Sequence, residues 1–387
     1  MKLGSELATL TAGIDRLYRA TPRSDGFLNR EGLIPVSLVE IRPQELRDYD
    51  EATDLLLGLE ARLAAEADGE LRRAYLAEMI DSLLALVTTF QEKPISFAER
   101  LRRQIRVDTQ MIDDRTLDGY RREIRSRLDA LGYRDGDLAG DVRRWESDAG
   151  VRPDAVIDVL ARYTREARRR SNALVADIGD DWLEPVGVTA MPFSAYCDYE
   201  ARKLLLNLDF PYTTFALKHL ACHEAFPGHL LHLALRERGV RDGTLPLDHA
   251  QVVTSSASSA LFEGIGDNGL SFLNWIETPG DELAVYLQRL RSALRCNAAW
   301  MVHMQGRTIE DVAPLIATAG FQDPATSKSR LSFLKHDLRT PFVYAYWCGE
   351  EAVAKTWRSI AVEDRTEFMS SLYGNMHTLS TLAAAYP

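Results

Sequence analysis

Helical periodicity is the feature of this sequence that most constrains its fold. From residue 3 to about residue 174, apolar residues recur at the three- and four-residue spacing that places them on one face of a helix. The longest such stretches are Ala52 to Ala67, Leu71 to Phe90 and Pro153 to Ala173. Turn-forming residues interrupt the pattern at Pro22 to Gly26, Gly132 to Gly136 and Gly150 to Pro153. This part of the chain is therefore predicted to be helical.

The pattern changes between Ile178 and Pro192, where Gly, Asp and Pro gather and alternating apolar residues follow. Residues 186–192 and 202–208 are predicted to be short strands of a small antiparallel sheet. Helical periodicity then returns from about Thr213 and continues to the end of the sequence. The expected fold class is mainly α, with a minor β element.

Chain length favours two packed lobes over one. The chain has 387 residues, which exceeds the usual size of a single hydrophobic core, and its 46% hydrophobic residues are ordinary for a globular protein. We expect an N-terminal helical lobe, residues 1–175, and a C-terminal lobe, residues 176–387. All eight histidines lie at or beyond His219, so the chemistry is predicted to belong to the C-terminal lobe.

Net charge and cysteine content limit the classes of partner and the cellular location that are expected for this chain. The formal net charge of −11 disfavours nucleic acid and acidic membranes as partners. A basic helix end, Arg162 to Arg170, is interpreted as a solvated face, with an anionic-ligand patch as the alternative. The sequence shows no signal peptide and no apolar run of the roughly 18 residues that a membrane span needs, which predicts a cytoplasmic protein. Its cysteines are widely spaced, which predicts buried free thiols; they are Cys197, Cys222, Cys296 and Cys348.

Four of the histidines fall within residues 218–232, which read KHLACHEAFPGHLLH. A His-Glu pair on a helix is the opening of the metalloprotease motif, in which the histidine binds metal and the glutamate activates water. His223 and Glu224 form this pair. The second histidine of the motif usually follows four residues after the first, whereas here it is His229, six residues on.

Pro227 and Gly228 explain this unusual spacing. On an undistorted helix, six residues rotate a side chain by about 600°, which would place His229 off the face of His223. Because Pro227 lacks an N–H and its ring collides with the His223 carbonyl, the helix is expected to break or widen there, and Gly228 adds backbone freedom. The break is predicted to return His229 toward His223 and to leave Glu224 beside the metal.

A carboxylate from elsewhere in the chain is needed to complete a site of two histidines and one acid. The best candidate is Glu263, in the segment SSALFEGIGD at residues 258–267. The small residues from Ser255 to Ala260 are expected to let this helix approach the His-Glu helix closely. Asp267 lies one turn after Glu263 and is predicted to receive the free ring N–H of a ligand histidine.

These motifs resemble those of a bacterial family, domain of unknown function 885 (DUF885), in the gluzincin clan of zinc peptidases. The matching segments are Leu206-Asn207, His223 to His229, Glu263-Gly264 and, more loosely, Pro341 to Gly349. The resemblance covers about residues 180–355. It implies zinc as the cofactor, His223, His229 and Glu263 as metal ligands, and Glu224 as the general base.

A late segment, residues 336–346, is rich in polar groups for a stretch flanked by apolar helix. Tyr346, Tyr344 and His336 are candidates for stabilising the oxyanion of the reaction, and Arg339 is the candidate for binding a substrate carboxylate. The alternative interpretation is two core tyrosines and a surface arginine.

The remaining histidines are interpreted more simply. His249, His303 and His377 are expected to be core residues. His219 is either a hydrogen-bond partner of the metal site or a packed neighbour, and His232 is a candidate substrate contact or further ligand.

The predicted function is a zinc-dependent hydrolase that cleaves an amide or peptide bond in a small peptide or amino-acid conjugate. Glu224 would take a proton from the metal-bound water and pass it to the leaving nitrogen. Two alternatives remain open at this point. Two histidines and one carboxylate are also the ligands of non-haem iron enzymes. A non-catalytic helical protein could instead hold a structural metal, closed by His219 or His232.

Overall fold

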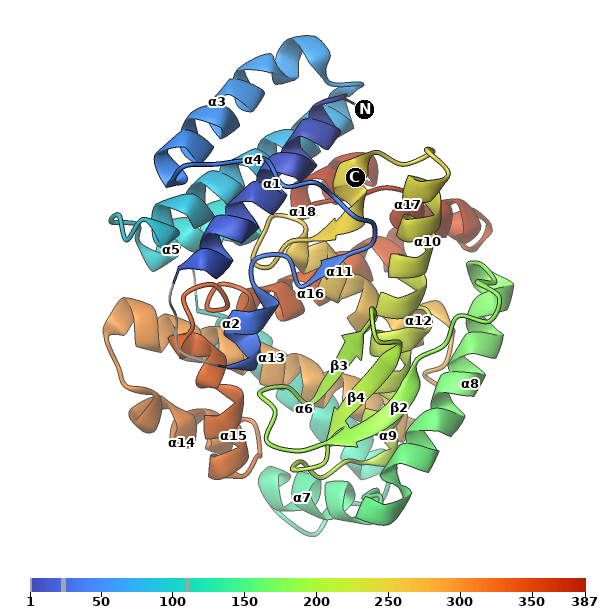
Figure 1. Cartoon of the computed structure of the whole chain (residues 1–387). Coiled ribbons are helices and arrows are strands. Elements are labelled where there is room, and N and C mark those ends of the chain that lie inside the picture. Colours follow the sequence, from blue (N-terminus) through green and yellow to red (C-terminus); the bar gives the residue numbers. More distant parts are fainter. Residues whose placement is uncertain (1, 22–25, 109–110) are drawn as a thin grey trace. The chain divides into compact units, whose positions relative to one another are not determined.

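The computed structural model describes residues 2–21, 26–108 and 111–387. Helices account for 66% of the chain and strands for 5%, which confirms the mainly α class (Figure 1). Residues 22–25, where a turn was predicted, lie outside the described residues. The two other predicted breaks are present, because residues 132–136 separate two helices and residues 150–152 precede a third. Among the described residues, no helix combines the length and apolarity needed to cross a membrane.

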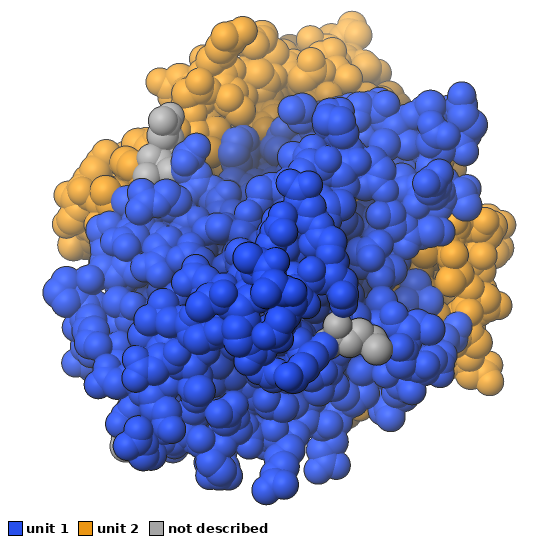
Figure 2. Space-filling view, turned by 90° about the horizontal axis from the view of Figure 1, so that it is seen from above, with its two compact units in different colours: residues 1–109, 232–264, 337–387 blue, residues 110–231, 265–336 orange. Residues whose placement is uncertain are grey.

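The chain forms two compact units, and each is assembled from separate stretches of sequence (Figure 2). Unit 1 contains residues 1–109, 232–264 and 337–387, and unit 2 contains residues 110–231 and 265–336. Two helices run from one unit into the other: α10 (His229–Arg241) and α11 (Ser259–Asp267).

The elements of unit 1 are mostly helices around a leucine-rich core. Its helices are α1 (Lys2–Ala20), α2 (Phe27–Glu31), α3 (Tyr49–Glu66), α4 (Glu70–Phe90), α5 (Phe97–Arg100), α16 (Val343–Ser359), α17 (Arg365–Gly374) and α18 (Leu379–Ala385). A π-helical turn, η1 (Leu101–Ile105), follows α5, and 3-10 turns lie at η4 (Leu247–Ala250) and η6 (Val362–Asp364). Two short strands, β1 (Val36–Ser37) and β5 (Gln251–Val252), pair antiparallel.

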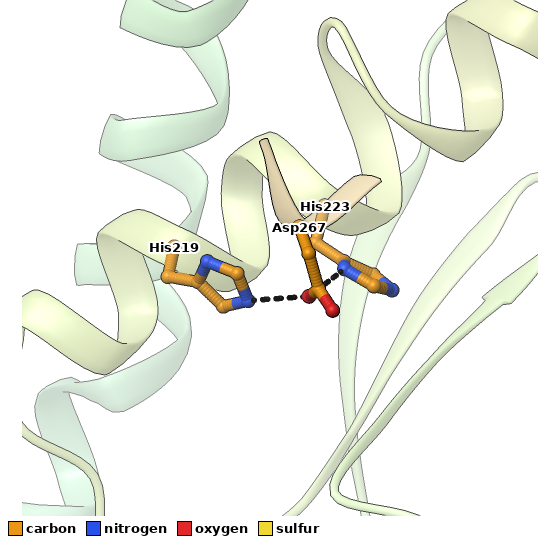
Figure 3. A group of neighbouring side chains, drawn as sticks. All are labelled: His219, His223 and Asp267. Atoms are coloured by element: carbon orange, nitrogen blue, oxygen red, sulfur yellow. Dashed lines mark hydrogen bonds and ion pairs between the residues drawn. The ribbon is translucent and has the colours of Figure 1, made fainter. Parts of the chain in front are cut away.

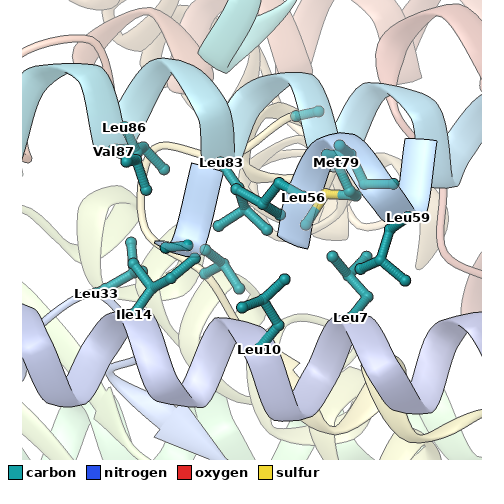
Figure 4. Close-up of a cluster of buried hydrophobic side chains, with 14 of the residues drawn as sticks. Leu7, Leu10, Ile14, Leu33, Leu56, Leu59, Met79, Leu83, Leu86 and Val87 are labelled. Carbon is teal, nitrogen blue, oxygen red and sulfur yellow. The ribbon is translucent and has the colours of Figure 1, made fainter. Parts of the chain in front are cut away.

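The core of unit 1 follows from the periodicity of its first helices. On α1, Leu7, Leu10 and Ile14 recur at helical spacing and face side chains of α3 and α4 (Figure 4). Leu56 of α3 and Leu83 of α4 are fully buried among them. Burying a leucine side chain stabilises a fold by about 1.5–3 kcal/mol, so this cluster is a main source of the stability of unit 1.

Unit 2 contains the remaining helices and a small sheet. Its helices are α6 (Asp114–Ala130), α7 (Leu138–Asp148), α8 (Val156–Leu174), α9 (Thr214–Leu220), α12 (Gly269–Phe272), α13 (Pro279–Gln305), α14 (Ile309–Ala319) and α15 (Pro324–Arg330). Short turns of helix lie at η2 (Pro153–Ala155), η3 (Ala221–Ala225) and η5 (Ser332–Lys335). The strands are β2 (Glu184–Val188), β3 (Ala195–Asp198) and β4 (Lys203–Asn207).

The longest helix of unit 2, α13, has capping residues at both of its ends. Thr278 accepts a hydrogen bond from the Asp281 backbone while the Asp281 side chain bonds back to Thr278, and Pro279 occupies the first turn. The helix ends at Gly306, whose φ of 67° is readily adopted by glycine. It packs against α6, α9 and α14, which makes it the central support of unit 2.

The predicted antiparallel sheet is a three-stranded mixed sheet in the order β2-β4-β3. Strand β2 runs parallel to β4, from Glu184 opposite Lys203 to Val188 opposite Asn207, and β3 runs antiparallel to β4. Strand β3, which has only four residues, was not predicted from the sequence. Because β3 lies between β2 and β4 in sequence, it reverses the chain and leaves β2 and β4 parallel.

The units do not divide at residue 176 as the sequence predicted. Helix α8, which precedes this point, packs against α9, η3 and β2, which follow it. Gly150 also pairs with Thr213 across the same point. Packing of α8 onto the later segment therefore keeps both sides of residue 176 in unit 2.

Arginines at the basic end of α8 form ion pairs with glutamates of the protein itself. Arg169 and Arg170 both bond to Glu166, and Arg170 also pairs with Glu277. These pairs agree with the interpretation of this segment as a helix face and not as an anionic-ligand patch.

Candidate metal site

The His-Glu segment lies where a regular helix widens into a π-helical turn. Helix α9 begins at Thr213, whose side chain accepts a hydrogen bond from the Ala216 backbone. It continues into η3, which carries His223 and Glu224, and the next helix, α10, begins at His229. The peptide bond between Phe226 and Pro227 is cis. The helix is interrupted between Ala225 and His229, so the break lies between the two histidines, where the sequence predicts it.

Gly228 allows the chain to turn back tightly at this break. A Cβ atom on Gly228 would lie 1.8 Å from the carbonyl oxygen of His223 and 2.4 Å from that of Cys222. The Gly228 backbone N–H also donates to the Cys222 carbonyl at 2.9 Å. Only glycine fits this close backbone approach.

The turn brings the two histidines together. The ring centroids of His223 and His229 are 4.5 Å apart, with an interplanar angle of 79°. His223, Glu224 and His229 each offer a ligand atom, and these atoms lie within 4.8 Å of one another. All three side chains are buried, with 6% to 7% of their surface exposed. Two imidazoles and a carboxylate in such a group are typical of a zinc or iron site.

Asp267 fixes the orientation of the His223 ring. Its Oδ1 lies 2.9 Å from His223 Nδ1 and 3.3 Å from His219 Nε2, and it accepts a hydrogen bond from Gln288 Nε2 at 2.8 Å. Figure 3 shows the second nitrogen of the His223 ring pointing away from Asp267. A carboxylate at Nδ1 favours the tautomer that leaves Nε2 available as a metal ligand.

Hydrogen bonding also controls the charge of Asp267. Burial acts to raise the pKa of Asp267, but the charge of His223 and the hydrogen bonds from His219 and His223 lower the pKa below its usual value. Asp267 is therefore an ionised acceptor, which suits a carboxylate that orients an imidazole.

His219, His223 and Asp267 are themselves close enough to form a second candidate metal group. Two donors about 2.1 Å from a tetrahedral zinc ion lie about 3.4 Å apart. The 2.9 Å contact between His223 and Asp267 is shorter than this and is a direct hydrogen bond. Gln288 also directs an amide donor at the same oxygen. We therefore interpret this group as a hydrogen-bond network that supports His223.

Glycines let α11 approach the His-Glu segment. A Cβ atom on Gly266 would lie 2.9 Å from His223 Nδ1, and one on Gly269, just after the helix, would lie 2.9 Å from the Cys222 Cβ. The same role for the small residues 255–260 stays a prediction. Ala260 contacts Gly349 of α16, and Gly264 faces the same residue.

The predicted third ligand, Glu263, is buried on α11 one turn before Asp267. It belongs to unit 1, whereas the two histidines belong to unit 2. The structure thus brings four predicted residues together within unit 2, namely His223, Glu224, His229 and Asp267. The role of Glu263 as a ligand stays a prediction.

The residues predicted to contact the oxyanion or the substrate carboxylate do not all belong to the same unit. Tyr344 is buried on α16 with its ring 6.3 Å from Phe97, and Tyr346 contacts Phe342. His336 is partly buried at the end of unit 2, after η5. The roles of these three residues in catalysis stay predictions.

Arg339 has a carboxylate partner inside the protein. Its guanidinium pairs with Glu31 of α2, and both side chains are mostly buried. A substrate carboxylate would have to compete with Glu31 for this arginine.

Most of the other histidines have identifiable neighbours. His232 contacts the rings of Phe262 and Tyr373, and His303 Nε2 lies 3.0 Å from the Leu334 carbonyl oxygen. His249 and His377 are buried in unit 1, as expected of core residues.

Several residues in the surroundings of the site had no functional signal in the sequence. Gln288 reaches Asp267 from α13, and Tyr212 lies in the loop between β4 and α9. Burial raises the pKa of Tyr212, and the charge of Glu224 acts in the same direction. Burial and the charge of Glu224 likewise raise the pKa of the Cys197 thiol on β3. These residues join the surroundings of the site only through the tertiary fold.

No family model matches this chain, and no curated protein matches its sequence. Two solved structures share the fold. One is a "putative lipoprotein" from Colwellia psychrerythraea, with a TM-score of 0.59 and 12% identity, covering 87% of this chain and 68% of that one. The other is a "putative lipoprotein of unknown function" from Shewanella oneidensis, with a TM-score of 0.56 and 15% identity, covering 87% of this chain and 72% of that one.

Proposed function

We propose that this protein is a zinc-dependent hydrolase that cleaves an amide or peptide bond in a small peptide or amino-acid conjugate. The observation that carries the proposal is the buried group of His223, Glu224 and His229, whose ligand atoms lie within 4.8 Å of one another. The resemblance to the DUF885 zinc peptidases includes these residues, because one of its matching segments is His223 to His229.

The residues of this site suit zinc. His223 presents Nδ1 to Asp267, which supports binding of a cation at the opposite nitrogen. In the proposal, His223 and His229 are the imidazole ligands, and Glu263, one helical turn before Asp267, is the carboxylate ligand. A zinc ion held by these groups supplies Lewis-acid activation of water and of the substrate carbonyl.

Glu224 is the proposed general base. It adjoins His223 on η3 and is buried with it, so its carboxylate lies in a site from which bulk water is largely excluded. It accepts a proton from the water that attacks the substrate carbonyl and then donates that proton to the leaving nitrogen. This role separates a hydrolase from a non-haem iron enzyme, which has no evident need for such a base.

Strand β3 supports a peptide as the substrate. It lies at the edge of the sheet and packs against η3, which carries Glu224. An extended peptide can pair with the free edge of such a strand through its backbone. In this proposal, β3 aligns the substrate and Glu224 acts on the peptide bond that lies beside it.

A cytoplasmic location is part of the proposal. Its support is that all four cysteines are free thiols, three of them buried, whereas disulfides persist in oxidising compartments.

The substitution Glu224→Gln tests the hydrolase. It keeps the side-chain volume but removes the basicity, so we expect zinc content and thermal stability close to wild type and turnover lower by about 100-fold or more. Turnover is measured on a panel of short peptides, and zinc by elemental analysis. His223→Ala is the matched comparison, because it should lose zinc as well as activity.

Two results would count against the proposal. Unchanged turnover in Glu224→Gln would exclude the general-base mechanism. Full occupancy by iron in the purified protein would favour the non-haem iron alternative.

A further inference from the structure

Three arginines gather in unit 2 beside the loop that leads to the His-Glu segment. Arg291 and Arg295 lie one turn apart on α13, and Arg330 is the last residue of α15. All three side chains are partly buried. The charges of Arg291 and Arg295 both act on Arg330, so the three guanidinium groups form one cluster of positive charge.

The three arginines differ in the hydrogen bonds and ion pairs that their side chains make. Arg291 binds both carboxylate oxygens of Glu146, at 2.7 and 3.2 Å, and donates Nε to the Gly320 carbonyl at 3.0 Å. Arg295 donates to the Ser292 hydroxyl at 2.8 Å. Glu146 therefore pairs with Arg291 through both of its carboxylate oxygens.

The side chain of Arg330 makes no hydrogen bond or ion pair with the described part of the chain. Its Nε is buried without a partner, and its guanidinium lies 5.4 Å from the centre of the Phe210 ring. Burial, followed by the charges of Arg295 and Arg291, lowers the pKa of Arg330 to about 10. Holding an unpaired charge in such a place destabilises the protein, and an anionic ligand would relieve this cost.

The position of Arg330 relates it to the proposed catalytic site. Phe210 and Tyr212 lie in the loop between β4 and α9, and α9 leads directly to η3 and Glu224. The Tyr212 hydroxyl is fixed 2.8 Å from the carbonyl oxygens of both Ser194 and Asn207. The charges of Arg330 and Glu224 both act on this hydroxyl. Ser194 directly precedes β3, and β3 packs against η3, so the loop that contains Phe210 and Tyr212 connects the surroundings of Arg330 to the turn that carries Glu224.

We propose that Arg330, assisted by Arg295, binds the terminal carboxylate of the substrate, so that the enzyme removes residues from the C-terminal end of short peptides. The guanidinium fork of Arg330 matches a carboxylate, and the Phe210 ring holds the fork in place. This inference rests on the proposed hydrolase function and names its substrate class. It moves the role predicted for Arg339, which Glu31 already neutralises, to an arginine whose buried Nε has no hydrogen-bond partner among the described residues.

Binding of a peptide acid and its amide tests the assignment. The probes are N-acetylglycyl-L-leucine and its C-terminal amide, which differ only in the charge of the terminal group. Binding is measured by calorimetry in the Glu224→Gln background, where hydrolysis is expected to be slow. We expect the acid to bind more tightly than the amide, and Arg330→Met to weaken binding of the acid by about 10- to 100-fold, in line with a lost hydrogen bond to a charged group.

Control variants separate this role from a structural one. Arg152→Met removes an arginine of unit 2 whose side chain is 81% exposed, and it should leave binding of both probes unchanged. Arg330→Met should fold, because it removes a buried charge and leaves a thioether beside the Phe210 ring. Arg330→Lys keeps the charge without the fork and should weaken binding of the acid less. It serves as the test variant if the methionine variant does not fold.

Several results would overturn the assignment. They are equal affinity for acid and amide, no binding of the acid at millimolar concentration, and equal weakening of both probes by Arg330→Met. Inorganic phosphate is a third probe, and Arg330-dependent binding of phosphate without binding of the peptide acid would indicate a site for a free anion. The preference for acid over amide is read from binding, whereas the hydrolase proposal is read from turnover in wild type and Glu224→Gln, so each can fail separately.

Discussion

Asp267 is the residue on which the geometry of the candidate metal site depends most. It is a buried carboxylate that contacts His223 and His219 and accepts a hydrogen bond from Gln288. Its hydrogen bond to His223 selects the tautomer and the ring orientation that a metal ligand needs. Glu263, one turn away on the same helix, is the proposed ligand, so α11 would supply both a ligand and the group that orients another.

Asp267→Ala should weaken zinc binding without unfolding the protein. Loss of the carboxylate releases the His223 ring, so we expect zinc affinity to fall by about 10- to 100-fold. Competition with a chelator of known affinity measures this change. Gln288→Met is the matched control, because it removes another donor to Asp267 but leaves the hydrogen bond to His223, and its effect should be much smaller. If Asp267→Ala left the zinc dissociation constant unchanged, Asp267 would be a packing residue.

Arginine assignments show what the sequence could and could not predict at this scale. Arg339 was a reasonable candidate because it lies in a polar segment near two tyrosines. Its partner Glu31 is 308 residues away in sequence, so no local pattern indicates that this charge is neutralised. Arg330 shows the opposite case, since only the folded chain reveals that its Nε is buried with no hydrogen-bond partner in the described residues.

At the scale of elements, the interrupted helix from α9 to α10 was the most predictable feature. The residues that break it, Pro227 and Gly228, act on their immediate neighbours, so their effect follows from local sterics. The long helices were predictable for the same reason, because their apolar spacing is local. Strand β3 was not predictable, since four residues carry little periodicity and its partners lie elsewhere in the chain.

Helix α11 is predicted to respond differently to alanine on its two faces. A Cβ atom on Gly264 would lie 2.3 Å from the Gly349 carbonyl oxygen, whereas one on Gly266 would meet the His223 ring at 2.9 Å. A backbone atom yields less readily than a side chain. We therefore expect Gly264→Ala to lower the melting temperature strongly, and Gly266→Ala to lower zinc affinity more than stability.

The two substituted residues are two positions apart on the same helix. Thermal unfolding and zinc titration of the two variants separate the effect on stability from the effect on zinc affinity. If Gly266→Ala bound zinc like wild type, the close approach of this helix to His223 would be irrelevant to the metal. If Gly264→Ala melted like wild type, α11 and α16 would have room that the structure does not indicate.

At the scale of the whole molecule, unit 1 contains buried histidines whose pKa values are lowered, so they link its stability to pH. Burial lowers the pKa of His232, His377 and His249, the last to about 3. Around His249, Asp248 acts to raise this pKa, whereas Arg72, Arg236 and His377 act to lower it. These histidines therefore stay neutral in the folded protein at pH values where an unfolded chain would protonate them.

The stability of unit 1 should fall as the pH decreases below about 6.5, the pKa of an unperturbed histidine. The unfolded chain then binds protons that the folded chain does not, at a cost of about 1.4 kcal/mol per pH unit for each histidine. Urea unfolding at pH 7.5 and pH 5.0 measures the loss. His249→Gln should show a smaller loss than wild type, whereas His303→Gln, in unit 2, should lose as much as wild type. An equal loss in all three proteins would place the acid sensitivity elsewhere.

The division of the chain into interleaved units has a consequence for synthesis. Unit 2 has all of its residues once residue 336 has been made, whereas unit 1 still lacks α16, α17 and α18. Helix α18 packs against α4, which was made at the beginning. Because domains tend to fold as units while the chain is synthesised, the part of α4 that contacts α18 is covered only after unit 2 has all of its residues. His223 and His229, which both belong to unit 2, can therefore meet before the unit that carries Glu263 is complete.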